Sequence, residues 1–108
     1  MKLSVRQRLL LLPVLPEKGS LLIIRIVREL REALSFDEKE IAELDLVQND
    51  GRVFWDESKE GDGKEINIGP RAQTIILDRL KELDGSQALT IDHLEICDLF
   101  GYNEGSTP

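Results

Sequence analysis

The amino-acid sequence predicts a single α+β domain in which helices outnumber strands. Apolar residues recur at helical spacing over most of the chain, and capping residues precede several of these stretches. One central segment instead places β-forming residues on both sides of an Asn-Asp-Gly turn. The 108 residues suit one domain, and we expect a compact body over residues 1–102 and a fraying tail over 103–108.

Two capping boxes predict two of the N-terminal helices. Residues 4–7 place a Ser three positions before a Gln, which predicts a helix over residues 5–12 that Pro13 ends. Residues 35–38 repeat the pattern with Ser and Glu, which predicts a helix over residues 36–44. Both helices are short.

A longer helix is predicted between them, over residues 21–34. Its apolar face is formed by Ile23, Ile26, Val27, Leu30 and Leu34. On the polar side, two pairs have the i,i+4 spacing of ion pairs, Arg25/Glu29 and Arg28/Glu32. The first turn is apolar on every side, which indicates either a deeply buried end or a binding partner.

The middle of the chain predicts the strands. Residues 46–48 and 53–55 are rich in β-forming residues and flank a turn whose Asn, Asp and Gly accept positive φ, which predicts a hairpin. Residues 56–64 are polar and predict an exposed loop. Isoleucines alternate with polar residues over 65–68, which predicts a further short strand.

Two helices are predicted in the C-terminal part. The first covers residues 70–84, because Pro70 suits a first helical position and Gly85 a C-cap. The second covers residues 91–100, with Thr90 as its cap. Three helices followed by a hairpin also describe a winged helix, so a winged-helix-like arrangement is the alternative architecture.

The net charge of −7 is unevenly distributed along the chain. Residues 1–36 contain seven basic and three acidic residues, a net charge of +4, whereas residues 37–108 contain seven basic and eighteen acidic residues, a net charge of −11. A candidate basic stripe consists of Arg25, Arg28 and Arg31. The overall acidity disfavours nucleic acid as a partner, because DNA-binding domains are usually basic.

The chain contains more apolar residues than are needed to give each short helix one buried face. The candidate protein-binding surface consists of Leu21, Leu22, Ile24 and Trp55. Exposed apolar patches mark sites of association, so we expect a protein partner or a homo-oligomer. The apolar runs at residues 9–12 and 21–24 are too short to span a membrane, and we expect a cytoplasmic protein.

No residues form a recognisable catalytic centre, and we expect neither an enzyme nor a cofactor. His93 is the only histidine and Cys97 the only cysteine, one helical turn apart. The acidic neighbours of Cys97 oppose thiolate formation, which favours a structural pair over a catalytic dyad. Two ligands are too few for a zinc site, and no small-molecule site is evident.

Two segments partly match a calcium-binding loop. Residues 56–67 contain alternating oxygen ligands and a glycine at the sixth position but end on Asn rather than Glu. Residues 84–95 lie between two predicted helices and end on Glu95, but Leu89 replaces the glycine of the sharp turn. The favoured interpretation is a solvated loop in the first case and helix caps in the second.

Several stretches together resemble small, functionally uncharacterised proteins of bacterial phages and prophages: residues 1–6, 9–10, 15–16, 26–32, 34–36, 64–69, 80–84 and 89–90. The resemblance covers most of the chain and implies a phage-encoded protein in the host cytoplasm, with no functional residue to carry over. We expect a non-enzymatic protein-binding or regulatory factor that acts by self- or hetero-association. The alternatives are a winged-helix DNA-binding regulator and a minor structural component of the virion.

Overall fold

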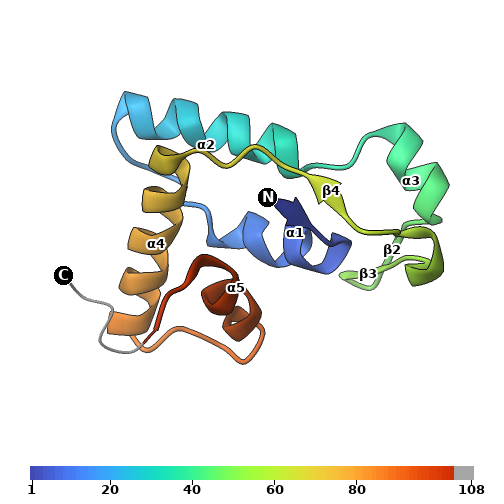
Figure 1. Ribbon diagram of the computed structural model, residues 1–108. Coiled ribbons are helices and arrows are strands. Elements are labelled where there is room, and N and C mark those ends of the chain that lie inside the picture. Colours follow the sequence, from blue (N-terminus) through green and yellow to red (C-terminus); the bar gives the residue numbers. More distant parts are fainter. Residues whose placement is uncertain (104–108) are drawn as a thin grey trace.

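The computed structural model describes residues 1–103 and shows an α+β fold (Figure 1). This part of the chain contains five α-helices, two short 3₁₀ helices (η1 and η2) and four short strands. In chain order these are β1 (Lys2–Leu3), α1 (Val5–Leu11), η1 (Leu12–Val14), α2 (Leu21–Leu34), α3 (Glu38–Leu44), β2 (Val47–Asn49), β3 (Arg52–Phe54), η2 (Glu57–Lys59), β4 (Lys64–Glu65), α4 (Pro70–Gly85) and α5 (His93–Phe100).

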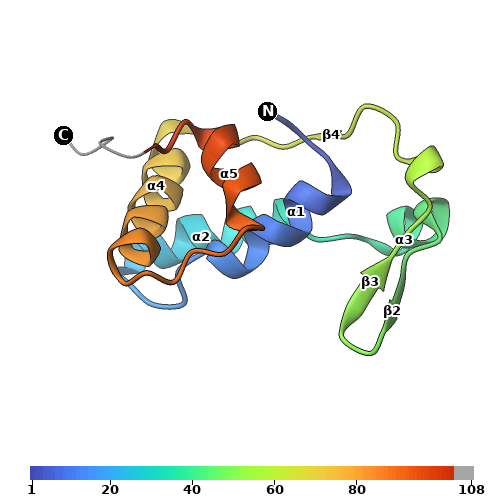
Figure 2. The same ribbon diagram turned by 90° about the horizontal axis from the view of Figure 1, so that it is seen from below.

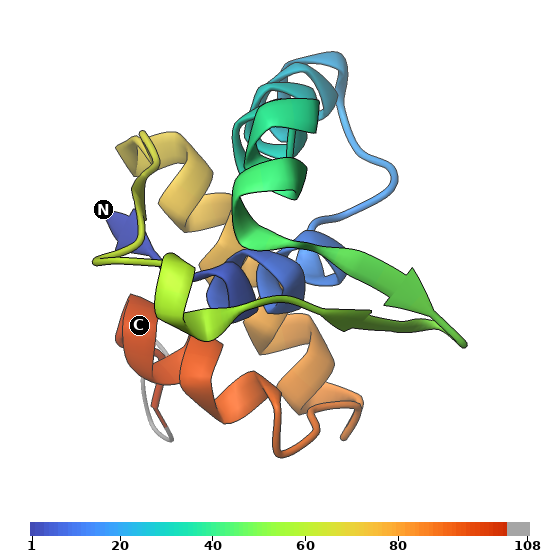
Figure 3. The ribbon, with the colours of Figure 1, turned by 90° about the vertical axis from the view of Figure 1, so that its right-hand side faces the viewer.

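The helices divide into a packed group and an outlying one. α1 contacts α5, and α4 contacts both α2 and α5, so these four helices surround one core. Figure 2 shows α3 and the β2–β3 hairpin at the other end of the molecule, where the hairpin projects away from the packed helices. The view along the molecule in Figure 3 shows α2 on the outside of the packed group.

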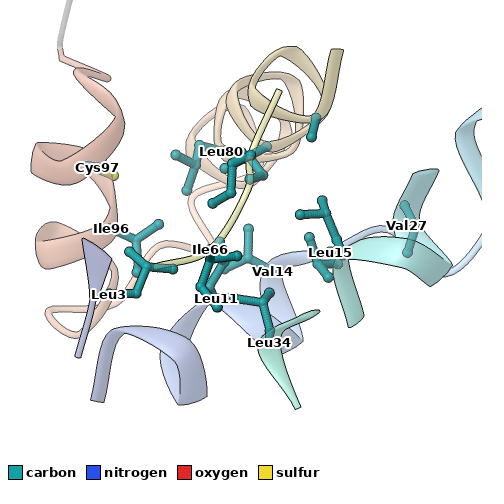
Figure 4. Close-up of a cluster of buried hydrophobic side chains, with 14 residues drawn as sticks. Leu3, Leu11, Val14, Leu15, Val27, Leu34, Ile66, Leu80, Ile96 and Cys97 are labelled. Atoms are coloured by element: carbon teal, nitrogen blue, oxygen red, sulfur yellow. The ribbon is translucent and has the colours of Figure 1, made fainter. Parts of the chain in front are cut away.

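The core draws on nearly every packed element (Figure 4). Leu11, Ile76, Leu80 and Ile96 are fully buried and come from α1, α4 and α5. Ile66, which is 2% exposed, lies among them although it follows a strand of only two residues. Because α3 contributes nothing to this cluster, its position depends on other contacts.

Local capping interactions confirm the predicted starts of α1 and α2. The Ser4 hydroxyl accepts a hydrogen bond from the Gln7 amide at 3.1 Å, and the Gln7 side chain accepts one from the Ser4 amide at 2.9 Å. α2 begins after Ser20, whose hydroxyl accepts from the Ile23 amide at 3.2 Å, and its bounds are those predicted.

The predicted capping box at residues 35–38 is wrong. α3 begins at Glu38, and its N-cap is Asp37, whose carboxylate accepts from the Glu40 amide at 2.8 Å. Ser35 instead ends α2, where its hydroxyl donates to the Arg31 carbonyl. The residues between the two helices are extended, and this places the Phe36 ring 3.9 Å from the guanidinium of Arg8.

The predicted hairpin is confirmed, with each strand displaced by one residue. β2 and β3 pair in antiparallel fashion with Asn49 opposite Arg52, so the turn has only two residues. Both turn residues have positive φ, 53° at Asp50 and 73° at Gly51, as a two-residue hairpin turn of this type requires. Leu46 and Trp55, which were expected in the strands, lie just outside the pairing.

The predicted strand at 65–68 is shorter and begins one residue earlier than expected, and its partner was not predicted. β4 pairs with β1, with Lys2 opposite Glu65 and Leu3 opposite Lys64. Within residues 1–103 the hairpin therefore forms a separate sheet without a third strand. This arrangement differs from a winged helix in which the hairpin extends a common sheet. Gly63 permits the close approach to β1, because its φ is +92° and a Cβ there would lie 2.7 Å from the Leu3 carbonyl oxygen.

Both C-terminal helices are confirmed, but their predicted caps are wrong. Gly85 is the last residue of α4 and not its cap, and positive φ occurs at Gln87 (58°) instead. α5 begins at His93, two residues later than expected. The N-cap of α5 is Asp92, and no side chain caps this helix. The amide of Thr90 donates to Nδ1 of His93 at 2.8 Å.

Two further expectations concern the tail and the membrane. Of the predicted tail, residues 104–108 lie outside the described residues. No helix within residues 1–103 combines the length and the apolar character needed to cross a membrane.

Candidate protein-binding surface

The first turn of α2 exposes two leucines. The Ser20 cap fixes where α2 begins, and Ile23 packs against the core. The helical turn then directs the side chains of Leu21 and Leu22 outward. Leu21 is 68% exposed and Leu22 is 53% exposed, whereas Ile24 is half-buried. Of the two possibilities left open by this apolar turn, the structure therefore excludes a deeply buried end.

An apolar groove continues from Leu22 along α2. The groove has a volume of about 700 Å³. Leu22, Ile26 and Ala33 line it from α2, and Pro70 and Ala72 line it from the start of α4. We call this feature the α2–α4 groove. It extends the exposed leucines into a concave surface, which is the shape that receives an apolar side chain from a partner.

The basic stripe lies on the outer side of α2. Arg25, Arg28 and Arg31 are all exposed. The predicted pairs Arg25/Glu29 and Arg28/Glu32 do not form, and none of these side chains is ion-paired with another residue in 1–103. The physical reason is that an exposed i,i+4 pair gains only about 0.3–0.5 kcal/mol, which the loss of side-chain freedom offsets.

Trp55 belongs to a different part of the molecule. Its ring is half-buried, and its Nε1 donates to Glu60 at 3.2 Å. It lines a second groove, of about 550 Å³, together with Leu9 and Leu10 of α1. The start of α2 and the hairpin lie at opposite ends of the molecule (Figure 1), so the structure does not unite Trp55 with the α2 leucines in one surface.

The most deeply buried charge within residues 1–103 is that of Arg8, which was not predicted from the sequence. The residue belongs to α1, is 1% exposed, and contacts the end of α2 and the helix α3. Its Nε donates to the Leu34 carbonyl at 3.1 Å, and its Nη2 donates to the Ser35 carbonyl at 2.7 Å. The sequence does indicate that this side chain is buried, because Arg8 lies three residues from Val5 and three from Leu11, on the apolar face of its helix.

Arg8 also holds α3 through Glu40. Nη1 of Arg8 donates to one carboxylate oxygen of Glu40 at 2.7 Å, and Lys64 donates to the other at 3.0 Å. The hydrogen bond from Arg8 holds the pKa of Glu40 below its ordinary value, although partial burial opposes this shift. Nη2 of Arg8 also donates to the second carboxylate oxygen of Glu40, at 3.3 Å, so the contact is bidentate. The position of α3 therefore depends on a buried arginine and not on an apolar side chain.

Glu60 is a second residue whose role was missed. One carboxylate oxygen accepts from the Val5 amide at the start of α1, and the other accepts from Nε1 of Trp55. The segment expected to be a solvated loop therefore returns to cap a helix. A carboxylate at a helix start is favoured by the free amides and the helix dipole.

His93 and Cys97 have separate structural environments. Nδ1 of His93 accepts from the Thr90 amide, so this ring nitrogen orders the turn before α5. Cys97 is buried, and burial raises the pKa of its thiol, with Asp98 and Asp84 acting in the same direction. The structure contains no hydrogen bond between His93 and Cys97.

The first acidic residue of each calcium-like segment accepts hydrogen bonds from within the protein. Asp56 accepts from the amide and the hydroxyl of Ser58, at 3.0 and 2.6 Å. Asp84 accepts from the Tyr102 hydroxyl at 2.6 Å, which raises the pKa of Tyr102 to about 12. Within residues 1–103, no group of three or more His, Cys, Asp or Glu side chains is arranged to hold a metal ion.

Comparisons of this chain with protein-family models, with curated proteins and with solved structures find no match.

Proposed function

We propose that this chain is a non-enzymatic protein-binding or regulatory factor, encoded by a phage and acting in the host cytoplasm. The observation that carries the proposal is the exposure of Leu21 and Leu22 beside the apolar α2–α4 groove. The phage setting comes from the sequence resemblance. On this proposal the partner contacts the outer side of α2 and not the hairpin end.

Leucine side chains that remain in water represent free energy that a binding partner can gain. Fully burying one leucine is worth about 1.5–3 kcal/mol. Leu21 and Leu22 retain 68% and 53% of their accessible surface in the isolated chain, so most of that free energy is available to a partner. The neighbouring groove supplies a shaped apolar surface, which isolated exposed leucines elsewhere lack.

The test is site-specific photocrosslinking in cells that express the full chain. A photoreactive phenylalanine derivative at position 22 should yield a discrete crosslinked product. The same group at position 94 is the matched control, because Leu94 is 60% exposed on α5, away from this surface. Equal products from both positions, or none from position 22, would contradict the proposal. Leu22→Asp should abolish the interaction and leave the thermal midpoint nearly unchanged, since the site is exposed.

A DNA-binding regulator is the second candidate, because Arg25, Arg28 and Arg31 are exposed and unpaired within residues 1–103. Glu29 and Glu32 lie beside them and would repel phosphates. α3, the helix that precedes the hairpin, contains three glutamates in seven residues. A gel shift of duplex DNA at low salt decides between the candidates: retardation at micromolar protein that Arg28→Glu abolishes would favour DNA.

A further inference from the structure

Four of the charged residues on the outer side of α2 share one sector of the helix surface, and their order there is complementary to itself. They are Arg25, Arg28, Glu29 and Glu32, so within this sector two positive charges precede two negative ones. At about 100° per residue, the four positions fall within one sector of about 100° around the helix axis. All four are exposed, and none is ion-paired with another side chain in residues 1–103.

We infer that α2 pairs with α2 of a second copy of this chain, in antiparallel orientation about a twofold axis between Arg28 and Glu29. The inference rests on the proposed function and names its partner. This axis places Arg25 opposite Glu32 of the second copy, and Arg28 opposite Glu29. Each contact occurs twice, because an interface on a twofold axis repeats every contact. A parallel pair would place like charges opposite each other.

The apolar residues complete this interface at its two ends. Leu21 and Leu22 lie at the start of α2, so in the antiparallel pair they reach the end of the second copy's α2. Ala33, which lines the α2–α4 groove, lies near that end. α2 runs along one edge of the molecule, and no other element of residues 1–103 lies on its outer side (Figure 1), which leaves room for a second helix.

Arg31 provides an internal control. It is exposed and unpaired within residues 1–103, like the other two arginines, but it lies about 60° outside the charged sector. An antiparallel α2 pair therefore makes little use of Arg31. A nucleic acid, which responds to positive charge along the whole stripe, would use all three arginines.

The test is sedimentation equilibrium of the full chain and its charge-reversal variants. The wild-type chain should form a reversible dimer that weakens with salt. Arg28→Glu and Glu29→Arg should each weaken it about tenfold, because each turns two attractive contacts into repulsive ones. An equimolar mixture of these two variants should recover wild-type affinity to within about threefold, because both contacts then join opposite charges. Arg31→Glu should change the affinity by less than about twofold. Circular dichroism checks that each variant keeps its helices.

Several results would overturn the inference. A chain that stays monomeric at about 1 mM has no such pairing. Variants that weaken association but are not rescued by mixing exclude the antiparallel register. Equal loss of DNA retention in Arg28→Glu and Arg31→Glu would identify a nucleic acid as the partner. If the chain is monomeric but position 22 still crosslinks to another protein, the inference fails and the proposed function stands. If neither association occurs, both fail.

Discussion

Replacing Arg8 by Met should destabilise the protein more than any exposed substitution on the same helix. The variant replaces the apolar part of the side chain with a shorter unbranched one and removes the guanidinium of a residue that is 1% exposed. The Leu34 and Ser35 carbonyls lose their donors, at 3.1 and 2.7 Å, and Glu40 loses its partner at 2.7 Å. Only Lys64 then remains as a donor to the Glu40 carboxylate.

The expected loss follows from these contacts. Removing one partner of a buried ion pair costs about 3–5 kcal/mol, because the remaining groups stay desolvated without a hydrogen bond. A domain of this size has a total stability of about 5–15 kcal/mol. We therefore expect the thermal midpoint to fall by about 10–20 °C. Arg8→Lys should give an intermediate loss, because an ammonium group cannot reproduce the bidentate geometry.

Urea denaturation followed by circular dichroism measures this loss. Arg6→Met is the matched control on α1, because the Arg6 side chain is 52% exposed and its ion pairs with Asp92 and Glu95 span 3.3 and 3.6 Å. The control should cost less than about 1 kcal/mol. If Arg8→Met loses no more than Arg6→Met, the buried cation does not hold α1, α2 and α3 together, and the reasoning is refuted.

Two further predictions test the backbone and the pH dependence. Gly63→Ala should cost about 2–4 kcal/mol, because φ is +92° and the new Cβ would lie 2.7 Å from the Leu3 carbonyl oxygen. Gly61→Ala, with φ +67° and open space, should cost only about 1 kcal/mol, and similar thermal melts of the two variants would contradict this. Glu40 has a lowered pKa in the folded state, so its contribution is complete above the ordinary value of 4.5 and is lost as the pH falls through the folded pKa. The urea concentration at the midpoint of unfolding should therefore decrease once the pH is lowered beneath about 4.5. If Glu40→Gln shows the same dependence of this midpoint on pH, Glu40 is not the group responsible.

The Arg8 cluster and the α2 surface are physically connected. Arg8 binds the carbonyls at the end of α2, so it fixes that end against α1 and α3. The outer side of α2 then keeps a defined orientation without contacts of its own. A surface held in this way loses little conformational entropy when a partner binds, which favours affinity.

The sequence by itself determined the elements whose stability is local. The Ser4 and Ser20 caps, the Asp50–Gly51 turn and the apolar period of α2 each depend on residues within one or two turns of chain. Local pattern was insufficient at residues 35–38 and at Gly85, where α3 begins after Asp37 and α4 includes Gly85. The order of charges along α2 is also a property of the sequence alone.

Only the tertiary structure decided which apolar residues face water and which charges are buried. The Arg8–Glu40 contact joins residues 32 positions apart, and the Val5–Glu60 contact joins residues 55 positions apart. No local pattern encodes such distances, and the pairing of β1 with β4 is equally remote. The first turn of α2 is apolar on every side, so its composition could not say which leucines would be exposed. Packing against α4 decided it, by partly burying Ile23 and leaving Leu21 and Leu22 in water.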